Sequence, residues 1–309
     1  MSAPVDISYL GPSGTFTEQA VLALVEGQTA STSPAPTVRA ALDDVRAGRA
    51  RSAVVPFENS VEGSVSATLD GLIHGSPLVI VREVEVSVRF AVVARPGAQL
   101  SDIKRLATHP HAAAQTRQWI AHHIPLAQVM PEASTAGAAE LVAAGQYDAA
   151  IASELAGVRH GLVIVADDIA DRAGAVTRFV QVQQPGPPEA MTGADNTTLV
   201  AYLHENGPGA LLEILEQFAT RGVDLRRLES RPTGEGLGEY CFAIDADAHI
   251  DEPRMAEALT GLHRTSSKVL FLGSYPRADG RVTPAPQGAD DASYRAASDW
   301  VQSLRGGNG

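Results

Sequence analysis

A chain of 309 residues is longer than one typical hydrophobic core accommodates, so the sequence predicts two or more domains. Its 24 basic and 36 acidic side chains give a net charge of −12, which argues against non-specific binding to nucleic acid, because that binding needs a basic surface. The single cysteine, Cys241, excludes an intramolecular disulfide framework.

Signals for a metal, a membrane or export are missing from the sequence. No Cys/His pair has the spacing of a zinc site, and His109, His111 and the pair His122-His123 suit a helix start or a surface better than ligation. No apolar run approaches the roughly 20 residues needed to span a bilayer. The first ten residues lack the basic flank and apolar core of a signal peptide, so we expect a cytoplasmic protein.

Short apolar runs alternate with amphipathic segments over the first part of the chain. The predicted strands are 5–10, 52–56, 77–83, 85–94, 106–108, 127–130, 148–152, 162–165 and 177–182. The predicted helices are 15–26, 37–47, 64–74, 110–122, 135–144 and 153–160. This alternation predicts a mostly parallel α/β architecture, in which the long apolar segment 85–94 is typical of a strand that crosses between two lobes.

A glycine-containing turn joins the first strand to the first helix. Gly11-Pro12-Ser13-Gly14 ends the strand, and Thr15 with Glu18 forms a Ser/Thr-x-x-Glu capping box. The N–H groups of a turn and helix N-terminus favour a carboxylate or another small anion. The turn lacks the Gly-Lys-Ser/Thr of a nucleotide-binding loop, and a plain tight turn is the alternative.

The segment after the strand 52–56 is dense in hydrogen-bonding side chains. Asn59 and Ser60 can orient a polar ligand, and Glu58 and Glu62 can do acid–base chemistry if burial raises their pKa values. The alternative is that Asn59 and Ser60 cap a turn and that at least one of the two glutamates is a surface residue.

Two further positions face a possible ligand. Gln115 lies near the start of the helix 110–122 and can reach a cleft, whereas Trp119, four residues later on the same face, suits the core better. Thr177 and Arg178 stand where a polar loop becomes a strand, and in open α/β folds ligands bind outside strand ends. An edge strand with one exposed arginine is the alternative at Arg178.

The remainder of the chain changes its rhythm after the stiff linker 183–188. Strands are predicted at 197–203, 223–230, 238–245 and 268–274, and helices at 208–220 and 253–264. This βαββαβ order predicts a ferredoxin-like module. Residues after Pro276 are rich in proline and glycine, and a short amphipathic segment follows at about 290–304.

These motifs resemble those of prephenate dehydratases. They are Gly11-Pro12-x-Gly14-Thr15-Phe16-x-Glu18-Gln19-Ala20, Pro56-Phe57-Glu58-Asn59-Ser60-Val61-Glu62-Gly63, His109-Pro110 with Gln115, and Thr177-Arg178-Phe179, in the family's order. The second module resembles an ACT domain, and Gly209-Ala210-Leu211 and Glu229-Ser230-Arg231-Pro232 are similar to the phenylalanine-binding motifs of such domains.

The resemblance implies a fold and a reaction. The fold is α/β, with a two-lobed catalytic domain resembling type II periplasmic binding proteins over residues 1–185, an ACT regulatory domain over 195–276 and a tail over 277–309. The reaction is the conversion of prephenate to phenylpyruvate, water and carbon dioxide in phenylalanine biosynthesis, without a cofactor or metal. L-phenylalanine is the implied allosteric effector, and a homodimer or homotetramer is expected to form through the ACT domains.

The resemblance also implies roles for individual residues. The implied catalytic residues are Thr177 and Glu62, the substrate-binding residues are Thr15, Asn59, Ser60, Gln115, Arg178 and Phe179, and the effector-binding residues are Asn206, Gly209, Ala210, Leu211, Glu229, Ser230 and Arg231. We expect the Thr177 hydroxyl to hydrogen-bond the departing ring hydroxyl, while Glu58, Glu62 or a water supplies the proton. Relatives often carry asparagine at the position of Gly174, so any contact of that asparagine is in doubt here.

Two other functions compete with this interpretation. Arogenate differs from prephenate by an amino group in place of a keto group, and no residue of the sequence separates the two substrates. A non-catalytic sensor of a small acid is a different class of function. The missing export signal and DNA-binding segment argue against a sensor, and Thr177-Arg178 beside Asn59-Ser60 is more than binding alone needs.

Overall fold

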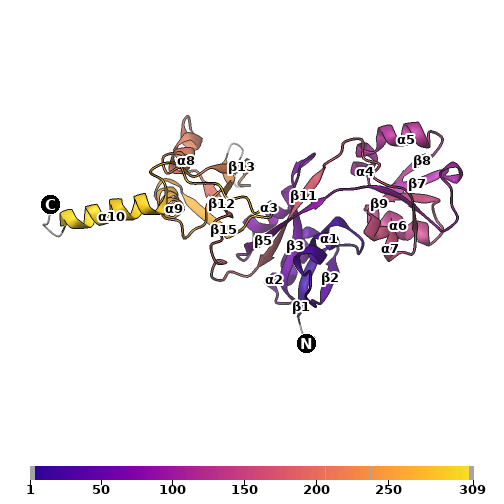
Figure 1. Cartoon of the computed structure of the whole chain (residues 1–309), viewed down its shortest axis with the longest axis horizontal. Coiled ribbons are helices and arrows are strands. Elements are labelled where there is room, and N and C mark those ends of the chain that lie inside the picture. Colours follow the sequence, from indigo (N-terminus) through magenta and orange to yellow (C-terminus); the bar gives the residue numbers. More distant parts are fainter. Residues whose placement is uncertain (1–3, 206, 235, 237–238, 306–309) are drawn as a thin grey trace. The chain divides into compact units, whose positions relative to one another are not determined.

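A computed structural model describes residues 4–205, 207–234, 236 and 239–305. The chain divides into two compact units (Figure 1). Residues 1–71 and 84–184 form the first unit, and residues 72–83 and 185–309 form the second. The domain limits expected at residues 185, 195 and 276 stay predictions.

The first lobe of the first unit is built on a sheet with the order β2-β1-β3-β11-β5, in which β4 pairs with β3 (Figure 1). Its strands are β1 (Val5–Leu10), β2 (Thr32–Ala35), β3 (Ala50–Asn59), β4 (Gly63–Ser64), β11 (Val176–Gln183) and β5 (Val79–Ser87), of which residues 84–87 belong to the first unit. Its helices are α1 (Phe16–Leu24), α2 (Val38–Arg46) and α3 (Ser66–Ile73). Ala20 and Val21 of α1 pack in one cluster with Ile7, Tyr9 and Phe179 of the sheet, which fixes α1 over the strands that carry the candidate site.

The second lobe has a sheet with the order β10-β6-β9-β7-β8. Its strands are β6 (Ala91–Ala94), β7 (Arg105–Thr108), β8 (Gln128–Pro131), β9 (Ala149–Ala152) and β10 (Val163–Ala166). Its helices are η1 (Leu100–Asp102), α4 (Pro110–Gln115), α5 (Arg117–His123), α6 (Thr135–Ala143) and α7 (Glu154–Arg159).

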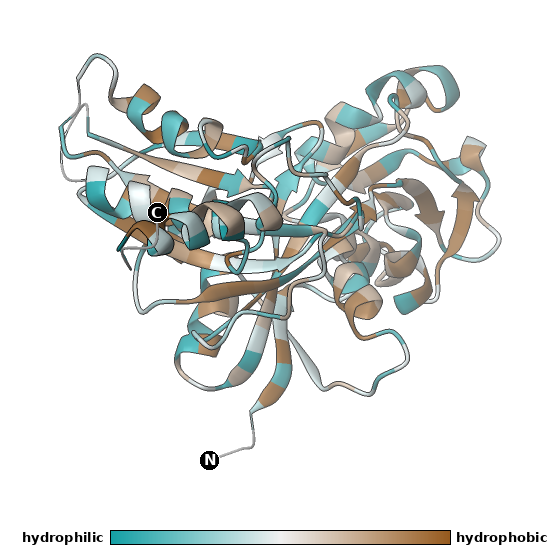
Figure 2. Ribbon diagram, turned by 60° about the vertical axis from the view of Figure 1, so that its left-hand side comes forward, coloured by the Kyte–Doolittle hydropathy of each residue, from teal (hydrophilic) through white to brown (hydrophobic). Residues whose placement is uncertain are grey.

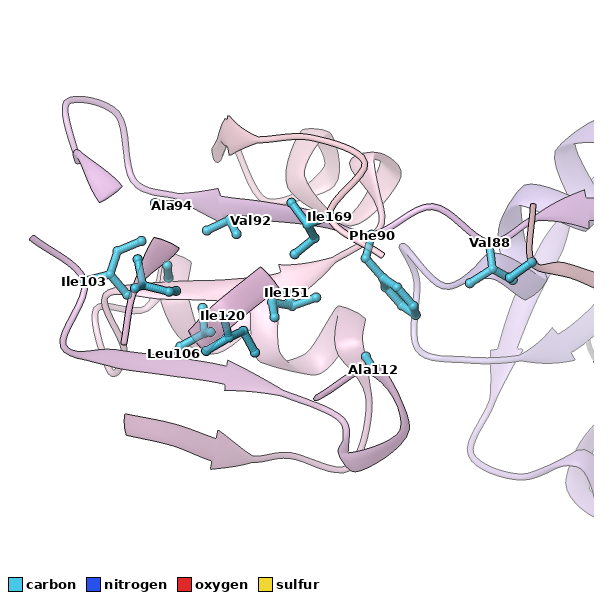
Figure 3. Close-up of a cluster of buried hydrophobic side chains, with 13 residues drawn as sticks. Val88, Phe90, Val92, Ala94, Ile103, Leu106, Ala112, Ile120, Ile151 and Ile169 are labelled. Atoms are coloured by element: carbon cyan, nitrogen blue, oxygen red, sulfur yellow. The ribbon is translucent and has the colours of Figure 1, made fainter. Parts of the chain in front are cut away.

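Both faces of this second sheet are covered by packed side chains. Successive side chains of each strand point to opposite faces, so neighbouring residues belong to different clusters. Val92, Leu106 and Ile151 belong to the cluster that holds Ala112 of α4 and Ile120 of α5 (Figure 3). Their strand neighbours belong instead to a second cluster, with the alanines of α6 and α7. The core of the lobe therefore lies on both sides of the sheet, which holds α4 and α5 in place for the site.

Two segments connect the lobes. The chain leaves the first sheet after β5 and enters the second at β6, and it returns between β10 and β11. Val88 N donates to Ala175 O at 2.7 Å, and Ile169 N donates to Phe90 O at 3.0 Å, so the outgoing and returning segments are bonded to each other. Val88 and Phe90 lie along this connection (Figure 3). The predicted two-lobed α/β fold is thereby confirmed.

Three details differ from the expectation. The sheets are mixed and not mostly parallel, because β11 returns from the other lobe and runs antiparallel to β3, and β6 runs antiparallel to β9 and β10. The predicted strand 85–94 is interrupted between β5 and β6, where Val88 bonds the returning segment. The predicted helix 110–122 is divided at Thr116 into α4 and α5. At this break, the N–H of Asp171 donates to Gln115 O at 2.8 Å.

The second unit contains the predicted βαββαβ module. Its elements are β12 (Asp195–Tyr202), α8 (Ala210–Ala219), β13 (Leu225–Pro232), β14 (Tyr240–Ala246), α9 (Pro253–Thr265), β15 (Lys268–Pro276) and, beyond the module, α10 (Asp291–Arg305). The sheet order is β13-β14-β12-β15. Hydrophobic and hydrophilic segments alternate along the helices and strands of the chain (Figure 2). Gly273 has φ of +132°, and a side chain there would meet the carbonyl of Ile80, so the segment 72–83 packs closely against β15.

Within the described ranges, no helix is both long and apolar enough to cross a membrane. The same ranges hold no group of three or more His, Cys, Asp or Glu side chains that could bind a metal ion.

Candidate active site

Asn59 and Thr177 form the centre of the candidate site, at the point where β3 ends and β11 begins. The two residues are direct partners in the antiparallel ladder. Asn59 Oδ1 accepts the N–H groups of Val61 and Glu62 at 2.8 and 3.0 Å, so the other end of the amide, Nδ2, faces Thr177 and donates to its Oγ1 at 2.8 Å. Since Asn59 Nδ2 can only donate, the proton of the Thr177 hydroxyl must point elsewhere. Thr177 is therefore prepared to donate a hydrogen bond to a ligand.

The turn after β3 is fixed to the start of β11. Ser60 N donates to Val176 O at 2.9 Å, and Ser60 Oγ accepts the N–H of Val176 at 2.9 Å. Asn59 and Ser60 thus cap a turn, as the sequence allowed. In addition, the two bonds of Ser60 fix the position of Val176, the residue before Thr177.

Glu62 extends from this turn to α4 of the other lobe. Gln115 Nε2 donates to Glu62 Oε1 at 3.1 Å, and His111 Nδ1 lies 2.5 Å from Glu62 Oε2. Both carboxylate oxygens of Glu62 therefore have a partner on α4. Glu62 thus links the turn of the first lobe to a helix of the second lobe.

Arg178 is buried and paired, and it is not an exposed edge residue. Its Nη2 lies 3.2 Å from Glu58 Oε2, and its guanidinium stacks over the ring of Phe57 at 4.8 Å. The antiparallel register places Arg178 opposite Glu58, which accounts for the pair. Phe179 is 2 % exposed and packs in the core of the first lobe. The substrate-binding roles expected of Arg178 and Phe179 stay predictions.

The turn before α1 lies at a contact between the two lobes. Gly14 has φ of +89°, and a Cβ there would lie 2.9 Å from Ala156 Cα, so glycine is required. Ser153 Oγ donates to Gly14 O at 2.7 Å, and Arg159 pairs with Glu18 at 2.5 Å.

Side chains of α1 already use two donors of the predicted anion site. Glu18 Oε2 accepts the N–H of Gly14 at 2.5 Å, and Thr15 Oγ1 accepts the N–H of Glu18 at 3.4 Å. The Thr15 hydroxyl itself donates to Leu10 O at 3.2 Å. Thr15 is the helix cap that the sequence predicted, whereas its contact with a substrate stays a prediction.

A hollow of about 420 Å³ opens beside Glu62 and Gln115. It is lined by Val61, Glu62, His111, Ala114, Gln115, Arg117, Gln118, Asp171 and Arg172. The volume suits a small organic molecule. Within the described residues, neither Arg117 nor Arg172 forms a salt bridge, so both charges are available to an anion in the hollow.

Asp171 and His111 are residues whose contacts sequence reasoning missed. Asp171 accepts the N–H groups of Gln118 and Trp119 at 2.9 and 3.0 Å and so caps α5 from outside the helix. Asp171 is therefore already engaged in this cap. Gly174 itself is exposed, with φ of +82°, and open space surrounds the point where a Cβ would lie. The contacts of Asp171 with α5 and of His111 with Glu62 could not be predicted from a local sequence pattern, because each joins segments that are far apart in the chain.

The family model for prephenate dehydratase matches residues 7–187, and the model for the ACT domain matches residues 197–264. This chain belongs to the prephenate dehydratase family. The prephenate dehydratase of Mycolicibacterium vanbaalenii is 45% identical over 314 residues, which cover 97% of this chain and 98% of that one.

Solved structures of similar proteins extend this finding. The prephenate dehydratase of Arthrobacter aurescens, solved in complex with L-Phe, is 50% identical with a TM-score of 0.91 and covers 97% of this chain and 99% of its own. A protein described as a quorum quenching acylase, GqqA, is 33% identical with a TM-score of 0.79 and covers 87% of this chain and 97% of its own. A similar fold is therefore also found in a protein described as an acylase, so the function has to be argued from the site.

The ACT domain of this family member has a second hollow, of about 460 Å³. It is lined by Leu203, His204, Glu205, Gly207, Pro208, Ala210, Glu213, Ile214 and Thr265. Gly209 caps α8 with φ of +92°, which favours glycine, and Leu211 lies in the first turn of the helix.

The other predicted effector residues lie apart from this lining. Glu229, Ser230 and Arg231 belong to β13 at the edge of the sheet, and Glu229 pairs with Arg227 and, at 3.6 Å, with Arg231. Asn206 falls outside the described residues. The structure thus brings the motif around Gly209 to the hollow, while β13 presents its motif along an open sheet edge.

Proposed function

We propose that this chain is a prephenate dehydratase that converts prephenate to phenylpyruvate, water and carbon dioxide. The observation that carries the proposal is the Asn59–Thr177 hydrogen bond, which leaves the Thr177 proton free to act on a ligand. It lies within motifs that this chain shares with the family over residues 7–187. The high identity to dehydratases across nearly the whole chain favours this reaction over acylase activity.

The reaction breaks two bonds of the substrate. The bond from the ring to its carboxylate breaks, carbon dioxide leaves, and the electron pair enters the ring. The ring becomes aromatic as the bond to the hydroxyl group breaks, and the departing oxygen takes a proton to leave as water. Much of the driving force therefore lies in the substrate, and the protein has to orient it and assist the departing hydroxyl.

Thr177 assists the departing hydroxyl by donating its proton in a hydrogen bond. Because a threonine hydroxyl is a weak acid, this contact stabilises the developing negative charge on the oxygen, and Glu58, Glu62 or a water supplies the proton.

The chain carries a net charge of −12, which repels a substrate with two carboxylates. Binding of prephenate therefore requires positive groups at the site itself. Arg117 and Arg172 on the hollow supply two positive charges, and Arg178, held by Glu58, supplies a third. Gln115, Ser60 and the start of α1 at Thr15 supply hydrogen-bonding groups that orient the ring.

Incubation of the purified chain with prephenate tests the proposal. We expect phenylpyruvate to accumulate, followed by its absorbance, with a turnover number of roughly 1–1000 per second, as is typical of enzymes. A parallel reaction with arogenate, followed by the appearance of phenylalanine, distinguishes the two substrates. Binding of prephenate without any product would contradict the proposal and support the sensor.

We also propose feedback inhibition by L-phenylalanine at the ACT domain. The supporting observations are the hollow beside Ala210 and the Arthrobacter aurescens relative solved with L-Phe. The effector carboxylate would meet the N-terminus of α8. An ACT pair would form a homodimer or homotetramer, with the effector bound at the interface. We expect the chain to act in the cytoplasm.

Steady-state assays with added L-phenylalanine check this regulation. We expect saturating L-phenylalanine to lower turnover or raise KM several-fold, because it binds two states of the enzyme with different affinity. D-phenylalanine is the matched control ligand, and sedimentation measures the oligomer. An unchanged rate and an unchanged sedimentation coefficient at saturation would exclude the regulation.

A further inference from the structure

Glu62 joins the two lobes of the first unit through a single face of α4. Glu62 belongs to the turn between β3 and β4 in the first lobe, and α4 belongs to the second lobe. His111 and Gln115 are four residues apart on α4 and therefore lie on the same side of the helix. His111 Nδ1 reaches one oxygen of Glu62 at 2.5 Å, and Gln115 Nε2 reaches the other at 3.1 Å.

This contact continues to Thr177 through the turn. The N–H of Glu62 donates to Asn59 Oδ1 at 3.0 Å, and Asn59 Nδ2 donates to Thr177 Oγ1 at 2.8 Å. The bond from Glu62 N is one of the two that fix which end of the Asn59 amide faces Thr177. A displacement of Glu62 would therefore loosen the group that orients Thr177.

Charged side chains surround His111. Its ring pairs with Glu62, and Arg117 and Arg172 line the same hollow. The ring of His109 lies 4.9 Å away, edge to face. Burial lowers the pKa of His109 and the neighbouring His111 lowers it further, whereas Glu62 raises it. Asp171, also on the hollow, is bound to the N–H groups at the start of α5.

We propose that His111 is a positioning residue for the dehydratase reaction: it clasps Glu62 across the two lobes and thereby keeps the Asn59 turn in the arrangement that orients Thr177. This inference rests on the proposed function and deepens it. His111 does not touch the reacting atoms. We expect the turn that contains Asn59 and Glu62 to loosen when the His111 donor is lost.

The His111 donor contributes strength to the contact because its acceptor is a carboxylate. A hydrogen bond to a carboxylate is charge-assisted and is roughly twice as strong as one between neutral partners. Loss of this donor should therefore loosen the turn and lower kcat/KM for prephenate.

Two substitutions at one position separate the donor from the imidazole ring. His111→Asn places a neutral amide N–H near the position of Nδ1, and His111→Leu removes the donor while keeping an apolar side chain of moderate size. His122→Leu is the matched control, because His122 is an exposed histidine on the neighbouring helix α5. Thermal unfolding is expected to change little in all three variants, since His111 is mostly exposed.

We expect His111→Asn to retain most of the native kcat/KM and His111→Leu to lose at least about fivefold. The His122→Leu control should match the native enzyme. Equal losses in the asparagine and leucine variants, or a native kcat/KM in the leucine variant, would overturn the proposal.

Hydrogen exchange without substrate tests the clasp independently of turnover. The N–H groups of Val61 and Glu62 are both bonded to Asn59 and should exchange several-fold faster in His111→Leu than in the native protein. Unchanged exchange would overturn the clasp even if prephenate is a substrate. Faster exchange in a protein that does not turn over prephenate would leave the clasp standing and remove the proposed function.

Discussion

At the residue scale, the direction of one hydrogen bond decides what the Thr177 hydroxyl can do. Two backbone N–H groups occupy Asn59 Oδ1, so its Nδ2 is turned towards Thr177. A structural role and a chemical role therefore coincide in Asn59: its capping of the turn is what aims the amide. The pairing of Arg178 with Glu58 is a structural contact as well, and it fixes the guanidinium beside the same pair of strands, β3 and β11.

Asp279 in the second unit predicts how stability depends on pH. Two-pronged hydrogen bonding to Arg277 lowers the pKa of Asp279 from its ordinary value of 3.8 to about 2, and the same contact raises the pKa of Arg277. The unfolded chain thus takes up a proton near pH 3.8 and the folded chain only near pH 2. Stability from this carboxylate is complete above pH 4 and is lost as the pH falls through 2.

Urea unfolding at pH 7 and at pH 2.5, with Asp279→Asn beside the native chain, measures this contribution. We expect the substitution to cost about 1–2 kcal/mol at pH 7, less than the full shift implies because the side chain is one-third exposed. The cost should shrink towards pH 2. A difference that stays constant between the two pH values would exclude the linkage.

At the element scale, α5 depends on a cap that it does not contain. It spans Arg117–His123, too short to be stable alone, and Thr116 at its start supplies no side-chain cap. Asp171 provides that cap from the segment that returns to the first lobe. The same carboxylate therefore fixes the wall of the hollow next to Glu62 and Gln115.

Replacement of Asp171 by alanine should cost about 1 kcal/mol, as the loss of an N-cap usually does. We also expect a higher KM for prephenate, because Gln118 and Arg172 of the hollow lose their support. Asp171→Asn should retain part of the effect. Denaturant unfolding and steady-state kinetics are the measurements, with the exposed Asp299 of α10 replaced by alanine as the control. If both alanine variants behave alike, the cap contributes nothing.

At the scale of the whole molecule, local patterns predicted the elements better than the contacts between them. The cap at Thr15 and the βαββαβ order were readable because both depend on nearby residues. The break at Thr116 was not readable, because it depends on Asp171, which comes from a different part of the chain. The direction of β11 likewise depends on the return from the second lobe.

The candidate site shows the same division. The motifs pointed to Asn59 and Thr177, and the structure places these two in contact. Their roles in turnover stay predictions. The clasp between Glu62 and His111 could not be inferred from the sequence, because it exists only where a turn of one lobe meets a helix of the other. A histidine that suits a surface in the sequence is, in the structure, the partner of a residue already singled out.

The most direct test of the central claim compares Thr177→Val with Thr177→Ser in the prephenate assay. Valine keeps the shape of threonine but has no hydroxyl, whereas serine keeps the hydroxyl that accepts from Asn59. We predict that the valine variant folds and loses at least about 100-fold in kcat, and that the serine variant stays within about tenfold of the native enzyme. A valine variant that turns over prephenate at the native rate would contradict the role of Thr177.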